Sequence, residues 1–268
     1  MTQKPARVLA IAGSDSSGGA GLAADLKTFS ALGVYGAFAI TAVTAQNTSG
    51  VNGVHDVPPA MVAAQIDAVA SDLRVAAVKI GMLSRPATIE AVASALDRWQ
   101  LPNVILDPVM VASTGARLLA PEALDLLRRL LLPRARVITP NLLEAAALLD
   151  GQPAKSEAEM QAHAERLLAL GAGAVLVKGG HGEGAESVDL LVDAQGVTRF
   201  AAKRIDTKNT HGTGCTLSAA IAAGIAKDQD LREAVRAAKD YTTAAIAAAD
   251  RLKIGSGQGP LHHFHRWW

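Results

Sequence analysis

Residues 77–108 read AVKIGMLSRPATIEAVASALDRWQLPNVILDP and contain one complete strand–helix–strand unit. Two short, mostly apolar runs, 77–80 and 104–107, lie on either side of a longer segment in which apolar residues recur every three or four positions. That spacing predicts a helix with a single apolar stripe, formed by Ile89, Val92, Leu96 and Trp99. Pro86 lies where the first turn of this helix is expected, a position that tolerates proline. Short connections between the three elements predict a right-handed crossover between parallel strands.

The same alternation of short apolar runs and amphipathic segments extends along the whole chain. Strands are expected at 8–12, 36–45, 77–80, 104–107, 136–139 and 174–178. Helices are expected between them, and two long alanine-rich helices are expected at 213–226 and about 231–253. Residues 187–204 are different, because apolar positions alternate on both sides of a Gln-Gly pair, which is typical of an antiparallel hairpin. These patterns predict one α/β domain over residues 1–268, a three-layer α/β/α sandwich with a mostly parallel central sheet and an edge β-hairpin.

The composition argues against several classes of protein. The 268 residues include 26 Lys and Arg against 25 Asp and Glu, a net charge of +1, which does not favour a partner bound through charge alone, such as nucleic acid or an anionic membrane. Half of the residues are hydrophobic, which excludes a disordered chain. The single cysteine cannot form an intrachain disulfide. The first residues lack a signal-peptide pattern and no segment has the composition of a membrane span, so a cytoplasmic protein is expected.

Open parallel sheets bind ligands beyond the carboxyl ends of their strands, so the segments that follow the strands are the first candidates for a site. The glycine-rich run 13–18 is not a Walker loop, because it is followed by Gly-Ala and not by lysine. The better candidate for a phosphate site is NTHGTGCTL at 209–217, which leads directly into an expected helix. Gly212, Thr213 and Gly214 can turn backbone N–H groups toward an anion, and the start of the helix adds unpaired donors. The alternative is an ordinary capped helix after a flexible loop.

Cys215 is expected in the first turn of that helix. The positive potential of a helix start biases a thiol toward the thiolate, which predicts a base or a nucleophile at this position. The alternative is a small buried residue that packs the helix, as most lone cysteines are. The position of Cys215 on the predicted anion loop favours the first interpretation.

Three charged residues follow separate strands of the predicted sheet. Asp107 ends one strand, where Pro108 prevents its extension, and Lys178 ends another. Glu144 lies one turn into a helix that Asn141 can cap. Two carboxylates at neighbouring strand ends can hold a hydrated Mg²⁺ together with substrate phosphates, and a lysine beside them can neutralise phosphate charge. Each residue taken alone also has a plainer interpretation, as a strand-end Asp, a capping Glu or a solvated Lys.

Two further segments suggest where an organic substrate binds. The run GSDSSGGAG at 13–21 joins the first strand to the first helix, and its glycines indicate the close approach of a ligand. Gln46 offers a donor and an acceptor on one planar amide, which suits the edge of an aminopyrimidine or pyridine ring, although a turn or capping role is more usual. The sequence HHFH at 262–265 suggests a metal cluster, but adjacent residues rarely converge on one ion, so a docked or frayed tail is expected.

Taken in order, these segments resemble the hydroxymethylpyrimidine/phosphomethylpyrimidine kinase family of thiamine biosynthesis, which is ribokinase-like. The resemblance rests on motifs spread over nearly the whole chain: GSDSSGGAG at 13–21, ADLKTF at 24–29, TAQNT at 44–48, KIGML at 79–83, LDPV at 106–109, TPNLLE at 139–144, VKGGH at 177–181, TKNTHGTGCT at 207–216 and HHFH at 262–265. No single motif is decisive, whereas the ordered set is highly specific.

The resemblance implies that the chain transfers phosphoryl groups from ATP, with Mg²⁺, to 4-amino-5-hydroxymethyl-2-methylpyrimidine and then to its monophosphate. It implies an α/β/α fold that is normally a homodimer. The residues that it assigns to the pyrimidine pocket are Gln46, which reads the ring, and Gly13, Asp25, Met82 and Val109. The residues that it assigns to the anion hole are Gly212, Thr213 and Gly214, and those that it assigns to ATP and Mg²⁺ are Lys178, Asp107 and Glu144, the last two as metal ligands.

Cys215 departs from the wider ribokinase-like pattern, in which an Asp after the second glycine is the catalytic base. A thiolate is a weak partner for the proton of a primary alcohol, so the backbone N–H groups and the metal are expected to contribute more to the acceleration than Cys215. Two alternatives are a pyridoxal or pyridoxine kinase on the same scaffold and a non-catalytic vitamer-binding protein, which the presence of Lys178, Glu144 and the glycine loop disfavours. Residues 179–185 and the hairpin behind them are expected to close over the substrate.

Overall fold

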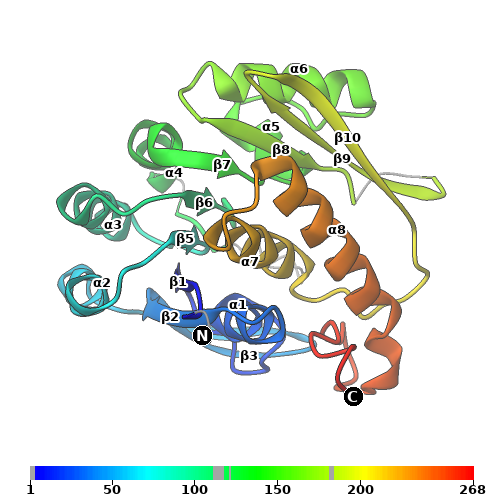
Figure 1. Cartoon of the computed structure of the whole chain (residues 1–268), viewed down its shortest axis with the longest axis horizontal. Coiled ribbons are helices and arrows are strands. Elements are labelled where there is room, and N and C mark those ends of the chain that lie inside the picture. Colours follow the sequence, from blue (N-terminus) through cyan, green and yellow to red (C-terminus); the bar gives the residue numbers. More distant parts are fainter. Residues whose placement is uncertain (1–3, 111–117, 121, 181–183) are drawn as a thin grey trace.

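The computed structural model describes residues 4–110, 118–120, 122–180 and 184–268. His181, the last residue of the VKGGH motif, and residues 182–183 of the expected closing segment lie outside these ranges. Within the described ranges, eight strands form one sheet in the order β10-β9-β8-β7-β6-β5-β1-β2 (Figure 1). The strands are β1 (Arg7–Ala12), β2 (Tyr35–Ile40), β5 (Ala77–Ile80), β6 (Val104–Leu106), β7 (Ala135–Ile138), β8 (Ala174–Lys178), β9 (Glu186–Asp193) and β10 (Gly196–Lys203).

The sheet is parallel except at one edge. β2, β1, β5, β6, β7 and β8 pair in parallel, whereas β9 runs antiparallel to β8, and β10 runs antiparallel to β9. The register of this edge hairpin places Gly196 opposite Asp193 and Lys203 opposite Glu186. The hairpin expected at 187–204 is therefore confirmed, and so is the mostly parallel central sheet.

Helices cover both faces of the sheet. One layer consists of α1 (Gly21–Ala31), α7 (Thr213–Ala226) and α8 (Leu231–Ala247), as Figure 1 shows. The other consists of α2 (Pro59–Asp72), α3 (Pro86–Trp99), α4 (Ala123–Leu126), α5 (Leu142–Leu148) and α6 (Glu157–Leu168). A π-helical turn, Leu127–Leu131, and a 3₁₀ turn, Leu132–Arg134, continue α4, and a second 3₁₀ turn, Ala249–Arg251, follows α8. The expected three-layer α/β/α sandwich is confirmed.

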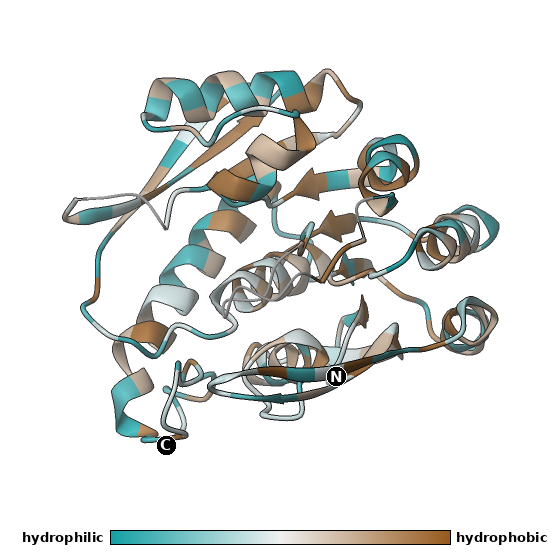
Figure 2. Cartoon of the chain, turned by 180° about the vertical axis from the view of Figure 1, so that it is seen from behind, coloured by the Kyte–Doolittle hydropathy of each residue, from teal (hydrophilic) through white to brown (hydrophobic). Residues whose placement is uncertain are grey.

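The central strands are buried on both faces because they carry apolar residues at successive positions. In β1, Leu9 and Ile11 pack toward the layer of α2 to α6, while Val8 and Ala10 pack toward α1, α7 and α8. All four are completely inaccessible to solvent. Figure 2 shows brown, hydrophobic strands in the interior and teal residues along the outer sides of the helices. A strand covered by helices on both sides has no face left for polar residues, which explains the continuous apolar runs of the sequence.

Two expected elements differ from the structure by more than one residue at an end. The strand expected at 36–45 is divided at Thr41, whose N–H donates to the Ala12 carbonyl oxygen at 3.0 Å and whose hydroxyl donates to the Met82 carbonyl oxygen at 2.7 Å. Beyond Thr41, β3 (Ala42–Asn47) leaves the main sheet and pairs antiparallel with β4 (Gly50–Asp56). The sequence pattern does not predict β4, because Gly and Asn interrupt its apolar residues. The helix expected at 231–253 ends at Ala247.

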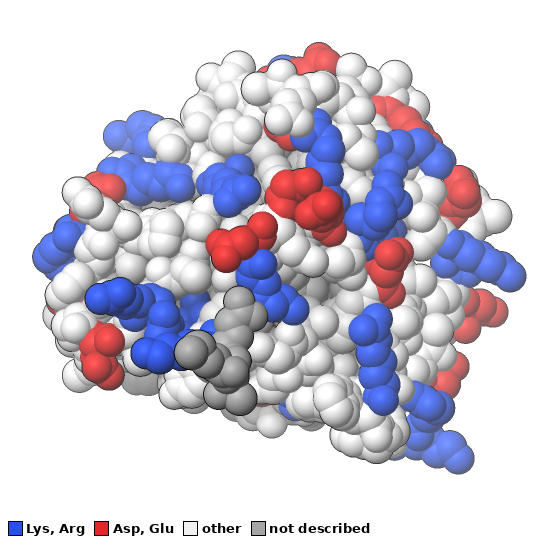
Figure 3. Space-filling view, viewed as in Figure 1, with Lys and Arg blue, Asp and Glu red and all other residues white. Residues whose placement is uncertain are grey.

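Figure 3 shows that Lys and Arg side chains are interspersed with Asp and Glu side chains over the face of the molecule seen in Figure 1. In the part of the chain that the structure describes, no helix combines the length and the hydrophobicity needed to cross a bilayer.

Replacing Leu9 by Ala should lower the free energy of unfolding by about 2–5 kcal/mol, because the change opens a cavity in the middle of the sheet. Leu9 is completely buried, whereas Leu143 in α5 is 63% exposed. Leu143→Ala is therefore the matched control and should change the stability by no more than about 0.5 kcal/mol. Urea unfolding followed by circular dichroism measures both variants, and equal losses would contradict the central position of β1.

Candidate active site

The candidate site lies at the carboxyl ends of the central parallel strands. β6, β7 and β8 are neighbours in the sheet and run in the same direction, so the residues that follow them meet at one edge. Asp107 follows β6, Lys178 ends β8, and Glu144 lies in the first turn of α5, which follows β7. The start of α7 adjoins them, since a Cβ on Gly214 would lie 3.2 Å from Lys178 Nζ and 3.6 Å from Asp107 Oδ2. The predicted anion loop and the predicted ATP–Mg²⁺ residues therefore form one cluster.

Lys178 joins the two carboxylates of this cluster. Its ammonium nitrogen lies 2.7 Å from Asp107 Oδ1 and 3.8 Å from Glu144 Oε2. The hydroxyl group of Thr139 donates to Asp107 Oδ1 at 3.2 Å, and Ser218 Oγ lies 3.4 Å from Asp107 Oδ2. Burial alone would lower the pKa of Lys178, but the carboxylates of Asp107 and Glu144 outweigh it and raise that pKa above its usual range. Lys178 therefore keeps its positive charge at neutral pH, beside the start of α7.

Glu144 is buried and caps α5. Asn141 Oδ1 accepts hydrogen bonds from the N–H groups of Leu143 and Glu144, and the Glu144 carboxylate accepts the Asn141 N–H at 2.7 Å. These bonds form a capping box. Burial raises the pKa of Glu144 to about 7, although the Lys178 ammonium lowers it. This carboxyl group therefore titrates near neutral pH, and a cation placed beside it would favour the ionised form.

The start of α7 touches the glycine-rich loop after β1. Gly212 precedes the helix with φ of +85°, and a Cβ on Gly212 would lie 1.9 Å from the carbonyl oxygen of Gly19. Only glycine fits this contact. Within the described residues, the N–H groups of Gly214 and Cys215 have no hydrogen-bond acceptor. Two donors at the start of the helix are therefore available to an anion.

Cys215 lies in the first turn of α7, within electrostatic reach of the buried Lys79 and of the partly accessible Lys178. The residue is partly accessible, but its sulfur lies among buried groups. Burial raises the pKa of the thiol to about 11, although the Lys79 ammonium and a hydrogen bond from the Gly21 N–H lower it. The expected bias toward the thiolate is therefore wrong, because the lost hydration of the sulfur outweighs the positive potential of the helix start.

A second ion pair lies close to Cys215. Asp25 of α1 and Lys79 of β5 are completely buried, and their charged atoms are 2.9 Å apart. Burial raises the pKa of Asp25 to about 6 against the effect of Lys79, and Asp25 Oδ1 has no hydrogen-bond partner among the described residues. Asp25 is expected on the pocket wall, but the structure seals it inside the protein, where Lys79 balances its charge. Sequence reasoning does not identify Lys79, although a charged residue within an apolar strand is a signal of a buried pair.

Three of the other predicted pocket residues, Gly13, Met82 and Gln46, lie near the turn after β1, whereas Val109 follows β6. Gly13 packs against Met82, since a Cβ on Gly13 would lie 3.0 Å from the methionine sulfur. Gln46, near the end of β3, is half-buried. Val109 is also half-buried, and its N–H donates to the carbonyl oxygen of Asp107 at 2.8 Å. Of the predicted pocket residues, Val109 is thus joined to the charged cluster through the segment that follows β6.

Two buried residues that the sequence analysis does not single out, Asp15 and His211, link the two glycine loops. His211 Nε2 lies 2.8 Å from Asp15 Oδ2 and 3.3 Å from the amide nitrogen of Gln46. Burial would raise the pKa of Asp15, but hydrogen bonds from His211 and Ser17 outweigh it and hold that pKa at about 2. The Asp15 carboxylate also accepts the backbone N–H groups of Ser17, Gly19 and Ala20. The signal for both residues was their place inside the two glycine motifs.

The C-terminal segment is docked against α7 and α8. His263 Nε2 lies 3.0 Å from Thr216 Oγ1, and the Tyr241 hydroxyl donates to the His263 carbonyl oxygen at 2.8 Å. His262 and His263 are both buried, and burial lowers the pKa of His263 to about 4. The expected docked tail is confirmed.

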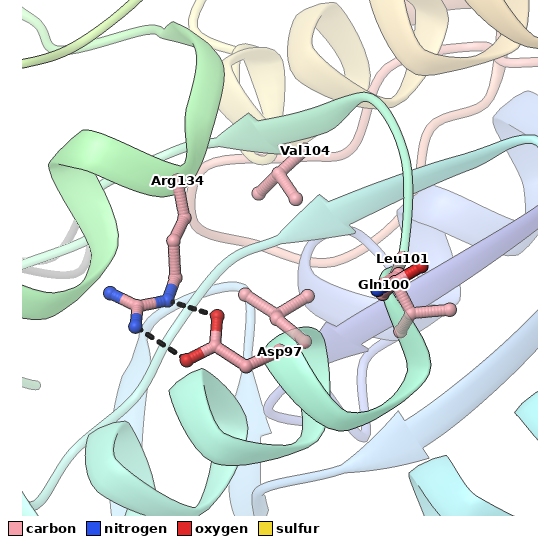
Figure 4. Close-up of a pocket in the computed structure, with 6 residues that line it drawn as sticks. Asp97, Gln100, Leu101, Val104 and Arg134 are labelled. Carbon is pink, nitrogen blue, oxygen red and sulfur yellow. Dashed lines mark hydrogen bonds and ion pairs between the residues drawn. The ribbon is translucent and has the colours of Figure 1, made fainter.

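A cavity of about 380 Å³ lies at the opposite end of the sheet (Figure 4). Val104 begins β6 and Arg134 precedes β7, so this cavity belongs to the amino ends of the strands. Figure 4 shows the Arg134 guanidinium joined to both oxygens of Asp97. The residues that line the cavity are Leu96, Asp97, Gln100, Leu101, Val104 and Arg134. Its charged groups already neutralise each other, so the cluster at the carboxyl ends is the better candidate for chemistry.

Known proteins are similar to this chain over nearly its whole length. The family model described as phosphomethylpyrimidine kinase matches residues 15–262. The hydroxymethylpyrimidine/phosphomethylpyrimidine kinase of Rhizobium meliloti is 60% identical over 260 residues, which cover 97% of each chain. The crystal structure of a phosphomethylpyrimidine kinase from Clostridium difficile is similar with a TM-score of 0.80 and 43% identity, covering 90% of this chain and 99% of that one. The ADP complex of Bacillus subtilis pyridoxal kinase is similar with a TM-score of 0.90 and 40% identity, covering 97% of this chain and 98% of that one.

Glu144 should make the stability fall as the pH rises. The folded protein holds the proton of Glu144 up to a pKa of about 7, whereas the unfolded chain releases it near the ordinary value of 4.5. The free energy of unfolding therefore decreases between these values, by at most about 3 kcal/mol from this group, and then stays level. Glu144→Gln removes this loss, so the variant should gain stability relative to the unchanged chain over that range.

Urea unfolding between about pH 5 and pH 8 measures this difference. Glu90→Gln on the exposed side of α3 is the matched control and should follow the unchanged chain at every pH. A difference between Glu144→Gln and the unchanged chain that is independent of pH would refute the raised pKa.

Proposed function

Because this chain belongs to the phosphomethylpyrimidine kinase family, we propose that it uses ATP to phosphorylate 4-amino-5-hydroxymethyl-2-methylpyrimidine and then its monophosphate, in thiamine biosynthesis. It is a phosphotransferase, as the family is. The assignment of the substrate rests on one arrangement at the start of α7. Gly214 lies next to Lys178, and His211, which precedes the helix, lies next to Gln46. We place this activity in the cytoplasm, as expected from the sequence.

The backbone at Gly212, Thr213 and Gly214 is proposed to hold the phosphoryl group during transfer. In phosphoryl transfer the protein acts mainly by positioning the reactants and by stabilising charge on the phosphoryl oxygens. Donors that are already oriented need no rearrangement when this charge develops. Gly214, whose N–H has no acceptor among the described residues, adjoins the ammonium group of Lys178, and this combination suits an anion with several oxygens.

ATP and Mg²⁺ are proposed to bind at Lys178, Asp107 and Glu144. These residues fit such a group, because carboxylate oxygens are preferred ligands of Mg²⁺ and because Glu144 can ionise when a cation approaches. The use of a nucleotide agrees with the ADP complex of the similar Bacillus subtilis pyridoxal kinase. Bound Mg²⁺ would supply charge neutralisation at the phosphates. Asp107 holds the Lys178 ammonium group in place, next to the start of α7.

Gln46, Gly13, Met82 and Val109 are proposed to form the wall around the pyrimidine, with the Gln46 amide paired to the amino edge of the ring. Cys215 has a smaller role than a general base, because its thiol stays protonated at neutral pH. We assign it contact with the reacting alcohol. Asp25 does not contact the substrate in this proposal. It neutralises the charge of the buried Lys79, which lies near Cys215.

The substrate assignment is tested by measuring ADP release with a panel of pyrimidine and pyridine alcohols, with and without Mg²⁺. Turnover of the aminopyrimidine alcohol and of its monophosphate is expected, with much weaker turnover of pyridoxal and loss of activity without Mg²⁺. A strong preference for pyridoxal would instead identify a pyridoxal kinase. Ligand binding without ADP release would identify a vitamer-binding protein.

In the same assay, Lys178→Met should reduce kcat by at least about 100-fold, because it removes a fixed charge beside the transferred group. Lys203→Met, at an exposed position of β10, is the control and should leave kcat unchanged. Cys215→Ala should reduce kcat less than Lys178→Met. Complete loss of turnover in Cys215→Ala with intact pyrimidine binding would show that the thiol takes part in proton transfer.

We also propose that the protein is a homodimer that assembles through an apolar surface at the β2 edge. Exposed apolar residues lie on both faces of β2 and of the β3–β4 ribbon and on α2, each between 43% and 55% exposed: Tyr35, Phe38, Val43, Val54 and Met61. β2 is the last strand of the sheet at this edge, and the β3–β4 ribbon lies outside the sheet. Exposed apolar groups that cluster on one part of a surface are typical of a protein interface.

The double variant Val54→Asp with Met61→Asp should dissociate this dimer, because each change would bury a charge in the interface. Light scattering after size-exclusion chromatography measures the mass of the particle. Val197→Asp on β10 is the matched control, since Val197 is 45% exposed at the opposite edge of the sheet. A monomeric mass for the unchanged chain, or a dimer that survives the double variant, would contradict this interface.

A further inference from the structure

A short chain of polar contacts surrounds the side-chain amide of Gln46. The amide nitrogen lies 3.3 Å from His211 Nε2, and the amide oxygen lies 3.4 Å from Thr44 Oγ1. His211 Nε2 also lies 2.8 Å from Asp15 Oδ2, and Thr44 Oγ1 donates to the Ser14 carbonyl oxygen at 2.9 Å. Asp15, Thr44 and His211 are buried, whereas Gln46 is half-buried, so the amide packs against buried polar groups and remains partly accessible.

The hydrogen on His211 Nε2 is determined by Asp15. Hydrogen bonds from His211, Ser17 and Ala20 keep the Asp15 carboxylate ionised, so it can only accept. At 2.8 Å, an unprotonated ring nitrogen would set two lone pairs against each other. His211 Nε2 therefore carries a hydrogen, which it shares between Asp15 at 2.8 Å and Gln46 at 3.3 Å, and it has no lone pair that could accept a hydrogen bond from the Gln46 amide nitrogen.

The hydrogen of the Thr44 hydroxyl is determined in the same way. A hydroxyl has one hydrogen, and that of Thr44 is used in the 2.9 Å bond to the Ser14 carbonyl oxygen. Toward Gln46, Thr44 Oγ1 therefore presents lone pairs. If the amide nitrogen points toward His211, two donors face each other there. If the amide oxygen points toward Thr44, two acceptors face each other there. Half a turn about the last side-chain bond exchanges the two ends and satisfies both contacts.

We propose that His211 and Thr44 lock the Gln46 amide with its oxygen toward His211 and its nitrogen toward Thr44, and that this lock determines which way round a heteroaromatic substrate is held. The amide oxygen keeps one free lone pair and the amide nitrogen keeps one free hydrogen. An amino group next to a ring nitrogen is complementary to this pair in one orientation only. The amino group lies on the His211 side, and the ring nitrogen lies on the Thr44 side.

This inference rests on the proposed function, in which Gln46 reads an aminopyrimidine alcohol. His211 and Thr44 are positioning residues in it, because they act on the ring through Gln46. The lock predicts rejection of the 4-oxo analogue, in which a carbonyl oxygen replaces the amino group and the neighbouring ring nitrogen carries hydrogen. That edge has the opposite order of donor and acceptor, so it pairs only with an amide turned the other way.

The test compares kcat/KM for the amino alcohol with kcat/KM for its 4-oxo analogue. His211→Leu and Thr44→Val each release one end of the amide, and each should lower the ratio of the two values by about tenfold or more, the worth of one hydrogen bond. His211→Gln restores an N–H donor and Thr44→Ser restores the hydroxyl, so both should keep the ratio of the unchanged chain. His163→Leu in α6 is the remote control and should also keep it.

A merely structural role for His211 would lower kcat/KM for both compounds together and leave their ratio unchanged in His211→Leu, which would overturn the inference. If His211→Leu does not fold, the Thr44 pair of variants decides the question by itself. Discrimination in the unchanged chain that survives in Thr44→Val would refute the lock while leaving the proposed function intact. An unchanged chain that does not turn over the amino alcohol at all would refute the proposed function and this inference with it.

Discussion

The close approach of Gly212 to the carbonyl oxygen of Gly19 holds the candidate site together, and it leaves no room for a side chain. The two glycines belong to segments far apart in the sequence, the loop after β1 and the start of α7. The first segment supports the residues proposed to face the ring, and the second supplies the N–H donors and adjoins Lys178. Reacting atoms must approach within about 3–3.5 Å for transfer, so a larger residue at this contact would separate two halves of one reaction.

The site gathers charge inside the protein, where charge is costly. Asp25, Lys79, Asp107 and Glu144 are buried, and the side chain of Lys178 is 12% exposed. Removal of an ion from water costs several kcal/mol, and a buried pair recovers this cost only in part, so these pairs are a weak source of stability. Their effect is on the field at the start of α7, where two fixed ammonium groups and oriented N–H donors need no rearrangement. The same surroundings keep Cys215 protonated, so the chemistry depends on oriented charge more than on a strong base.

Features that depend on neighbouring residues were predictable from the sequence. β8 and α7 have the expected bounds, because an apolar run and an uninterrupted alanine-rich helix are determined locally. The meeting of Asp107, Glu144 and Lys178 was also predictable, since the ends of adjacent parallel strands share an edge.

Features that depend on distant contacts were not predictable in this way. β4 forms only because β3 leaves the sheet and offers it a partner. Lys79 and Asp25 appear separately in the sequence, and only their pairing reveals that both are buried. The pKa of Cys215 was predicted in the wrong direction, because the position on the helix is local but the loss of hydration comes from the whole fold.

The β3–β4 ribbon belongs both to the proposed dimer interface and to the proposed binding site for the ring. It leaves the main sheet at Thr41, it carries Gln46, and three positions before Gln46 it exposes Val43 on the proposed interface. A second copy bound there would restrain the same backbone that presents the amide to the ring. Thermodynamic linkage is reciprocal, so any factor by which assembly strengthens ring binding is the factor by which the ring strengthens assembly. Dilution would then dissociate the dimer and lower the activity of each molecule, and a saturating concentration of substrate would oppose that loss.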